Sequence, residues 1–148
     1  MDYAVTAQQM KAIDQNTIKN IGIPSMVLME RAALAVAEAA EHMAKELAEA
    51  GVTIISGLAR GIDGAGHKGA LDGGGKTFAV LGCGVNICYP SAHYKLYGQM
   101  LTHGGIISEF PLDSGPIPMH FPMRNRIISG LSDAVLVVEA KEKSGSLI

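Results

Sequence analysis

The sequence predicts an α/β fold, namely a truncated, three-layer Rossmann-like domain with a mostly parallel sheet and additional N-terminal helices. Two observations support this class. Short runs of β-branched and apolar residues alternate with longer stretches of helical composition. Connections of 20 residues or more separate these runs, which suits right-handed crossovers between parallel strands.

Two helices are expected before the sheet. Residues 7–20 place apolar side chains near helical spacing, and Gly22 with Pro24 ends that helix. Ser25 then caps a long helix rich in Ala, Leu, Glu and Lys, and Gly51 terminates it.

Four strands are expected after these helices, at residues 52–56, 77–82, 105–109 and 134–139. The carboxyl ends of parallel strands meet at one edge of a sheet, where open sheets bind their ligands. We therefore expect the binding site at that edge.

The turn after the first strand has the composition of an anion site. Ser56 and Gly57 end the strand, Arg60 and Gly61 follow, and Asp63 is placed to cap the next helix. Free backbone N–H groups at such a helix start, with an arginine beside them, favour a phosphate. The alternative is that Arg60 pairs with a carboxylate at the strand end.

A second cationic helix start lies at residues 121–132. Pro122 stands near the start of this helix, and Arg124, Asn125 and Arg126 crowd its first turn. The two arginines project to different faces, so one is expected to reach the ligand and the other to be structural. Asn125 either caps the helix or hydrogen-bonds phosphate or base. Two cationic helix starts in one small domain predict a polyanionic ligand.

From about residue 41 to 148 the sequence resembles the Rossmann-like domain of the DNA-processing protein A family (DprA/Smf). The matching motifs occur in order at 56–63 followed by His67, 79–84 leading to Tyr89-Pro90, 108–111, 121–132, 138–140 and 143–147. Members of this family bind single-stranded DNA and load RecA during natural transformation. The resemblance implies a DNA-binding protein that is not an enzyme, with no cofactor and no metal.

In the family, the aromatic residue that matches Phe121 stacks on a base, so Phe121 is expected to be a platform for DNA. Its alternative role is a plug in the hydrophobic core. His67 is expected to be a packed, hydrogen-bonded core group. The predicted DNA-binding residues are Ser56, Gly57, Arg60, Gly61, Phe121, Arg124, Asn125, Arg126, Lys143, Ser144 and Ser146.

The first 40 residues resemble a different family. Segments 5–14, 22–25 and 28–33 are similar to the start of the YjeF N-terminal domain, the NAD(P)HX epimerase. The chain therefore reads as a natural or engineered chimera of segments 1–40 and 41–148, packed as one compact unit. The epimerase family's Asn-Asn-Gly-Gly-Asp segment is absent. An epimerase-type fragment, or a chimeric chain without activity, is the alternative to DNA binding.

Two family features are missing from this sequence. No Gly-Ser-Arg turn occurs, although in the family it ends a central strand and lines the DNA pocket. The family also continues beyond the position of Ile148 into elements that carry dimer and RecA contacts, so RecA loading is not expected here. A sheet that lacks its central strand has an apolar edge, which predicts a homodimer or a swapped assembly.

Composition is compatible with a cytoplasmic, globular protein. The 148 residues are 48% hydrophobic, with no apolar run long enough to span a membrane and no cationic leader. The net charge of −2 is unevenly distributed, because residues 1–50 carry −3 and residues 51–148 carry +1. Three of the four arginines lie in the two cationic turns. Cys83 and Cys88 have neither redox-pair nor zinc-site spacing, so both are expected to be free thiols.

Overall fold

The computed structural model describes residues 4–138, 140 and 144. The chain divides into two compact units, Met1–Val36 and Ala37–Ile148. This division lies near residue 40, where the two sequence resemblances meet. The assignment of each segment to a family remains a prediction from the sequence.

The first unit is helical. Helix α1 spans Ala7–Asn16 and continues into one π-helical turn, η1, at Thr17–Ile21. Thr6 and Gln9 form a capping box, in which each side chain accepts a hydrogen bond from the other residue's backbone N–H. Gly22 ends the helix with φ +80°, as predicted. Every described residue of this unit keeps some exposure to solvent, so the apolar side chains of α1 have no covered face.

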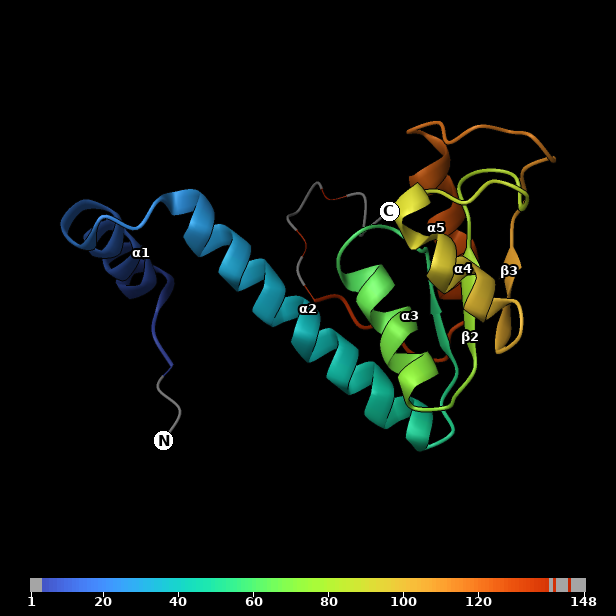
Figure 1. Cartoon of the computed structure of the whole chain (residues 1–148), viewed down its shortest axis with the longest axis horizontal. Helices are drawn as coiled ribbons and strands as arrows, with labels where there is room; N and C mark the ends of the chain where they lie inside the picture. Colours follow the sequence, from blue (N-terminus) through green and yellow to red (C-terminus); the bar gives the residue numbers. More distant parts are fainter. Residues whose placement is uncertain (1–3, 139, 141–143, 145–148) are drawn as a thin grey trace. The chain divides into compact units, whose positions relative to one another are not determined.

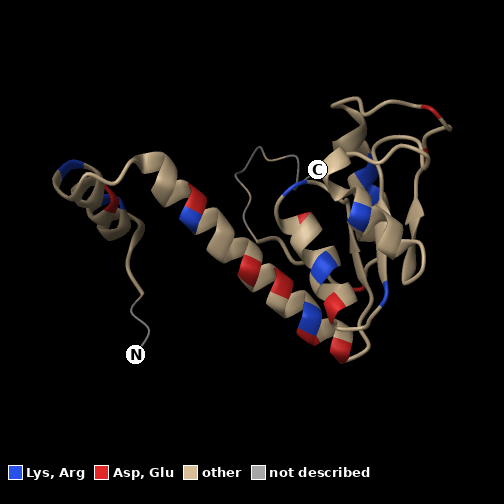
Figure 2. Cartoon of the chain, viewed as in Figure 1, with Lys and Arg blue, Asp and Glu red and all other residues tan. Residues whose placement is uncertain are grey.

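Helix α2 spans Ser25–Glu49 and begins in the first unit. The charged residues of α2 are of both signs, whereas helix α5, His120–Gly130, carries basic residues and no acidic ones (Figure 2). The buried residues of α2 are Ala44 and Ala48. Among the residues that the structure describes, no helix combines the length and apolar character needed to cross a membrane.

The second unit contains a parallel sheet of three strands in the order β1-β2-β3 (Figure 1). The strands are β1 at Ile54–Ser56, β2 at Thr77–Val80 and β3 at Gly104–Ile107. Thr77 aligns with Ile54 on one side and with Gly104 on the other. The predicted parallel α/β class is confirmed, with strands shorter than the sequence suggested.

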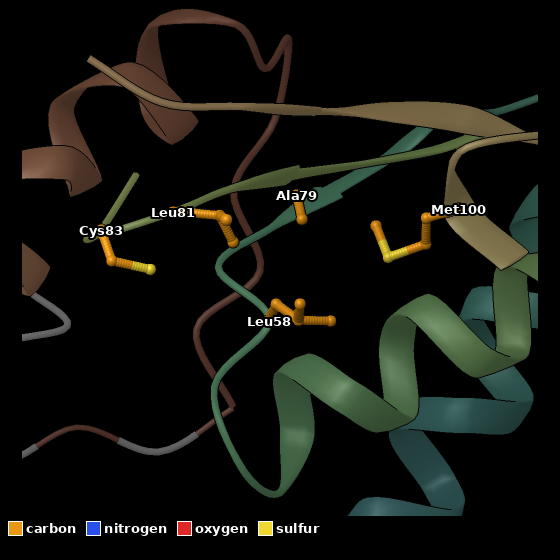
Figure 3. Packing of buried hydrophobic residues seen from close by; sticks show 5 residues of the cluster. All are labelled: Leu58, Ala79, Leu81, Cys83 and Met100. Carbon is orange, nitrogen blue, oxygen red and sulfur yellow. The ribbon is translucent and has the colours of Figure 1, made fainter. Parts of the chain in front are cut away.

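Helices cover both faces of this sheet. Helix α3, Ile62–Asp72, contacts β1 and β2, while α4, Tyr94–Met100, contacts β2, β3 and α3. A short 3-10 turn, η2 at Ser91–His93, precedes α4. Helix α5 packs on β2 and lies on the opposite face from α3 (Figures 1 and 3).

The hydrophobic core lies between the sheet and the layer of α3 and α4. Its buried residues come from the turn after β1, from β2 with its extension, and from α4 (Figure 3): Leu58, Ala79, Leu81, Cys83 and Met100. Partly buried apolar side chains, among them Leu71 and Ile106, pack around this cluster. The two cysteines are free thiols, as expected.

The predicted fourth strand is not formed over residues 134–138, and Glu139 lies outside the described residues. Val135, Leu136, Val137 and Val138 are 61%, 64%, 44% and 41% exposed. Strand propensity reflects packing against neighbouring strands. Because the described part of the sheet has three strands and none pairs with this segment, its β-branched composition does not produce a strand.

Candidate functional site

The turn that follows β1 at the carboxyl edge of the sheet is held by Asp63. The Asp63 carboxylate accepts hydrogen bonds from the backbone N–H groups of Gly57, at 3.0 Å, and Ala59, at 3.2 Å. Asp63 lies within α3, which spans Ile62–Asp72, so it is not the cap of this helix. The residue at the cap position is Gly61, which has φ +81° and no side chain to cap the helix. The predicted cap was wrong. Two N–H groups expected to meet a phosphate already bond a carboxylate.

The carbonyl groups of the same turn are also occupied. Arg124 Nη1 donates to the carbonyl of Gly57 at 2.7 Å and to that of Val80. His93 Nδ1 donates to the carbonyl of Leu58 at 3.0 Å. Leu58 is fully buried with φ +57°, a backbone region that bulky residues rarely adopt. The turn is therefore a rigid loop clamped by side chains from α5 and η2.

Arg124 is the structural member of the predicted arginine pair. Its side chain is buried, at 4% exposure, and burial lowers its pKa. An arginine remains charged in this setting. Its Nε also donates to Asn125 Oδ1 at 3.1 Å, and Asn125 is half-buried. Arg124 thus joins the ends of β1 and β2 in this structure, and its contact with DNA stays a prediction from the sequence.

Two other arginines of the predicted site are exposed. Arg126 is exposed and forms an ion pair with Glu109, which follows β3. Surface pairs of this kind contribute about 1 kcal/mol or less, so a phosphate can replace the carboxylate. Arg60 is exposed on the clamped loop, and its guanidinium forms no hydrogen bond or ion pair with any residue in the described part of the chain. The alternative role of Arg60 as a carboxylate partner is not seen there.

Phe121 is half-buried at the start of α5. Its ring lies over Gly82 at the end of β2, where an added Cβ would come within 2.9 Å of Phe121 Cδ1. The Arg124 guanidinium carbon lies 5.8 Å from the centre of the Phe121 ring, and the ring of Tyr89 lies 5.6 Å away, tilted by 40°. Phe121 is therefore neither a buried plug nor a freely exposed platform.

A second set of contacts joins the ends of β2 and β3. Ser108 Oγ donates to the carbonyl of Cys83 at 2.7 Å and accepts from the N–H of Phe110 at 3.0 Å. The Phe110 ring stacks on His120 at 3.8 Å, and His120 Nδ1 donates to the carbonyl of Gly82 at 3.1 Å. These contacts give residues 108–110 a structural role at the same edge.

His67 is a packed core group, as expected. Thr77 Oγ1 donates to the carbonyl of Ile54 at 2.8 Å, so it accepts the bond from His67 Nδ1 at 2.7 Å. The proton is then on Nδ1, and the buried Nε2 has no hydrogen-bond partner. Burial lowers the pKa of His67 to about 4. Within the described residues no group of three His, Cys, Asp or Glu side chains could hold a metal ion.

The predicted residues thus divide into three groups. Arg60, Gly61 and Arg126 are exposed, whereas Ser56, Phe121, Asn125 and Ser144 are half-buried and Gly57 and Arg124 are buried. Lys143 and Ser146 lie outside the described residues. Sequence reasoning placed Tyr89 in a family motif but did not name it as a site residue, and it missed His93, whose only signal was its position after the second strand.

Comparison with known proteins identifies a family for most of the chain. A family model described as DNA recombination-mediator protein A matches residues 25–148. Protein Smf of Escherichia coli K12 is 58% identical over 103 residues, which is 69% of this chain and 28% of that protein. DNA processing protein DprA of Bacillus subtilis is 48% identical over 107 residues, or 72% of this chain and 36% of that protein. The chain therefore spans about a third of the length of these curated relatives.

Two solved structures are similar. DNA processing protein A from Streptococcus pneumoniae superposes with a TM-score of 0.62 at 42% identity, covering 79% of this chain and 40% of that one. DNA processing protein A from Helicobacter pylori superposes with a TM-score of 0.69 at 34% identity, covering 76% and 51%. The latter structure is described for its mode of binding single-stranded DNA.

One relative bears on the N-terminal segment. NAD(P)H-hydrate epimerase of Limosilactobacillus fermentum is 34% identical over 140 residues, or 94% of this chain and 58% of that protein. This match does not establish the YjeF-like origin of residues 1–40. The family model above begins at residue 25, inside that segment.

Proposed function

This chain belongs to the family of DNA recombination-mediator protein A, and we propose that it binds single-stranded DNA at the carboxyl edge of its sheet. The observation that carries the proposal is the hydrogen bond from Arg124 of α5 to the carbonyl of Gly57, because it joins two elements that each offer a group to DNA. Helix α5 carries the half-buried ring of Phe121, and the loop after β1 carries Arg60, a cation without a hydrogen bond or ion pair to any residue that the structure describes. Aromatic stacking with nearby cationic groups is how sequence-tolerant single-strand sites hold nucleic acid.

The proposed contacts follow from exposure. Arg60 meets a phosphate directly, and Arg126 does so by exchanging its ion pair with Glu109. Phe121 stacks on a base. Lys143, Ser144 and Ser146 follow the last predicted strand, and we retain them as phosphate contacts on the strength of the sequence resemblance.

We propose binding without catalysis. The described part of the edge contains no nucleophile paired with a free base, because His93 and His120 bond to backbone carbonyls and the Asp63 carboxylate bonds to backbone N–H groups. The epimerase alternative is not favoured, since the family model over residues 25–148 and the more similar DprA and Smf relatives support a DNA-processing role. A homodimer remains a further proposal, motivated by the exposed apolar segment 135–138.

The experiment that tests this function is a fluorescence-anisotropy titration of labelled oligo-dT with the full 148-residue chain. Removing the unpaired cation by Arg60→Ala is expected to weaken binding by about three-fold to ten-fold at low salt, since one phosphate contact is lost. Arg31→Ala is the matched control, because Arg31 is an exposed arginine on α2 and has no place in the proposed site. Equal binding by the parent, Arg60→Ala and Arg31→Ala would show that Arg60 does not contact the DNA.

A further inference from the structure

The more exposed aromatic ring at the carboxyl edge belongs to Tyr89. Tyr89 is 46% exposed, whereas Phe121 is half-buried against Gly82 and near the guanidinium of Arg124. The Tyr89 hydroxyl makes no hydrogen bond to a residue in the described ranges. A large ring with a free hydroxyl and nearly half its surface in solvent is available to a ligand.

The rings of Tyr89 and Phe121 are in contact. Their centres are 5.6 Å apart and their planes are tilted by 40°, which is the spacing of rings in direct contact. A base cannot enter between them, because a base sandwiched by two rings needs the thickness of a further aromatic layer. A base that stacks on Tyr89 therefore uses the part of the ring that Phe121 does not cover.

Tyr89 is also tied to the loop that carries Arg60. Four residues after Tyr89, His93 donates from Nδ1 to the carbonyl of Leu58 at 3.0 Å. Leu58 stands two residues before Arg60 in the clamped loop. The same short segment thus positions an aromatic ring and anchors the loop that presents a cation.

We propose that Tyr89 is a second base-contacting residue of the single-stranded DNA site, beside Phe121, and that the pair receives unstacked bases of any sequence. The proposal rests on the DNA-binding function proposed above. Every base has a π-face, so stacking on Tyr89 adds affinity without selecting a sequence. The Tyr89 hydroxyl is free to hydrogen-bond at the rim of the stacked base.

The test compares Tyr89→Leu with Tyr94→Leu in oligo-dT anisotropy titrations of the full chain. Tyr94 is a matched control, because it is 76% exposed and lies five residues further on, at the start of α4. Tyr89→Leu is expected to weaken binding by about five-fold or more, which is the loss of one stacked base. Tyr94→Leu is expected to bind like the parent, and Tyr89→Phe, which keeps the ring, to retain most of the affinity.

An abasic oligonucleotide of the same length separates stacking from charge. If Tyr89 stacks on a base, the parent and Tyr89→Leu bind the abasic strand equally. Unchanged binding of oligo-dT by folded Tyr89→Leu would overturn the inference about Tyr89. Because the parent would still bind oligo-dT in that case, the proposed DNA-binding function would stand. Absence of binding by the parent would overturn both.

A second measurement needs no variant. An iodouracil-substituted oligonucleotide crosslinked to the parent protein under light is expected to attach to the peptide that contains Tyr89, as identified by mass spectrometry. Attachment to Phe121 without any at Tyr89 would overturn the inference, even if Tyr89→Leu failed to fold.

Discussion

The imidazole of His67 is fully buried, and its hydrogen bond to Thr77 fixes which nitrogen carries the proton. Thr77 bonds onward to Ile54, so this chain of contacts joins α3, β2 and β1. Protonation of His67 would place a charge on Nε2, which is buried and has no partner. The neutral form is therefore the one that the folded state favours.

This residue predicts a loss of stability in acid. Burial lowers the pKa of His67 from the usual 6.5 to about 4. The unfolded chain takes up the proton first, so stability is complete above pH 6.5 and is lost as the pH falls from 6.5 to 4. A shift of that size corresponds to roughly 3 kcal/mol.

Urea unfolding between pH 7 and pH 4 measures this effect. The parent is expected to lose roughly 3 kcal/mol more than His67→Gln over that range. His42→Gln is the control, because His42 is exposed on α2, and it is expected to follow the parent. Parallel pH profiles for the parent and His67→Gln would contradict this account.

Single residues at the site were predictable when their role depended on local sequence. The exposure of Arg60 agrees with its place in a polar turn, and that of Arg126 agrees with the expectation that the two arginines of this helix project to different faces. The burial of Arg124 depends on the carbonyls of Gly57 and Val80, which lie 67 and 44 residues earlier in the chain. The sequence indicated that one arginine of the pair is internal but could not identify which.

Helices and strands were predictable where composition and capping agreed. The glycine that ends α1, the length of α2 and the positions of β1, β2 and β3 follow the sequence pattern closely. The segment 134–138 has strand composition without a neighbouring strand to pair with. Pairing is a tertiary property, so propensity alone placed a strand where the structure has none.

Three elements meet at Gly57. Arg124 of α5 donates hydrogen bonds to the carbonyl of Gly57, which follows β1, and to the carbonyl of Val80, which ends β2. A Cβ at this position would overlap the Arg124 guanidinium. Gly57→Ala is therefore expected to lower the free energy of unfolding by about 3 kcal/mol or more, since it displaces a buried, hydrogen-bonded charge. Urea unfolding measures the change.

Gly66→Ala is the matched control for this prediction. Gly66 lies inside α3, and a Cβ there meets nothing within 4 Å. Alanine is the better helix former, so this variant is expected to gain about 0.5–1 kcal/mol. If the unfolding free energy of Gly57→Ala lay within about 0.5 kcal/mol of the parent value, as for an ordinary surface substitution, Arg124 would not be holding α5 to the strand ends as proposed.

The chain as a whole joins an exposed helical unit to an α/β unit that carries the proposed site. Its net charge of −2 predicts no broad attraction to DNA, so binding must come from a few local contacts. The sequence anticipated the α/β class, and the site at the carboxyl edge stays a prediction. It could not anticipate that Asp63 and Arg124 would bond the loop's own backbone, because those contacts depend on the folded geometry.

The salt dependence of oligo-dT binding tests the central claim most directly. Three phosphate contacts, from Arg60, Arg126 and Lys143, predict that the logarithm of the binding constant falls with the logarithm of salt concentration at a slope of roughly −2, since each contact contributes about −0.7. Flat anisotropy at low salt, with circular dichroism showing a folded chain, would contradict the proposal that this protein binds single-stranded DNA.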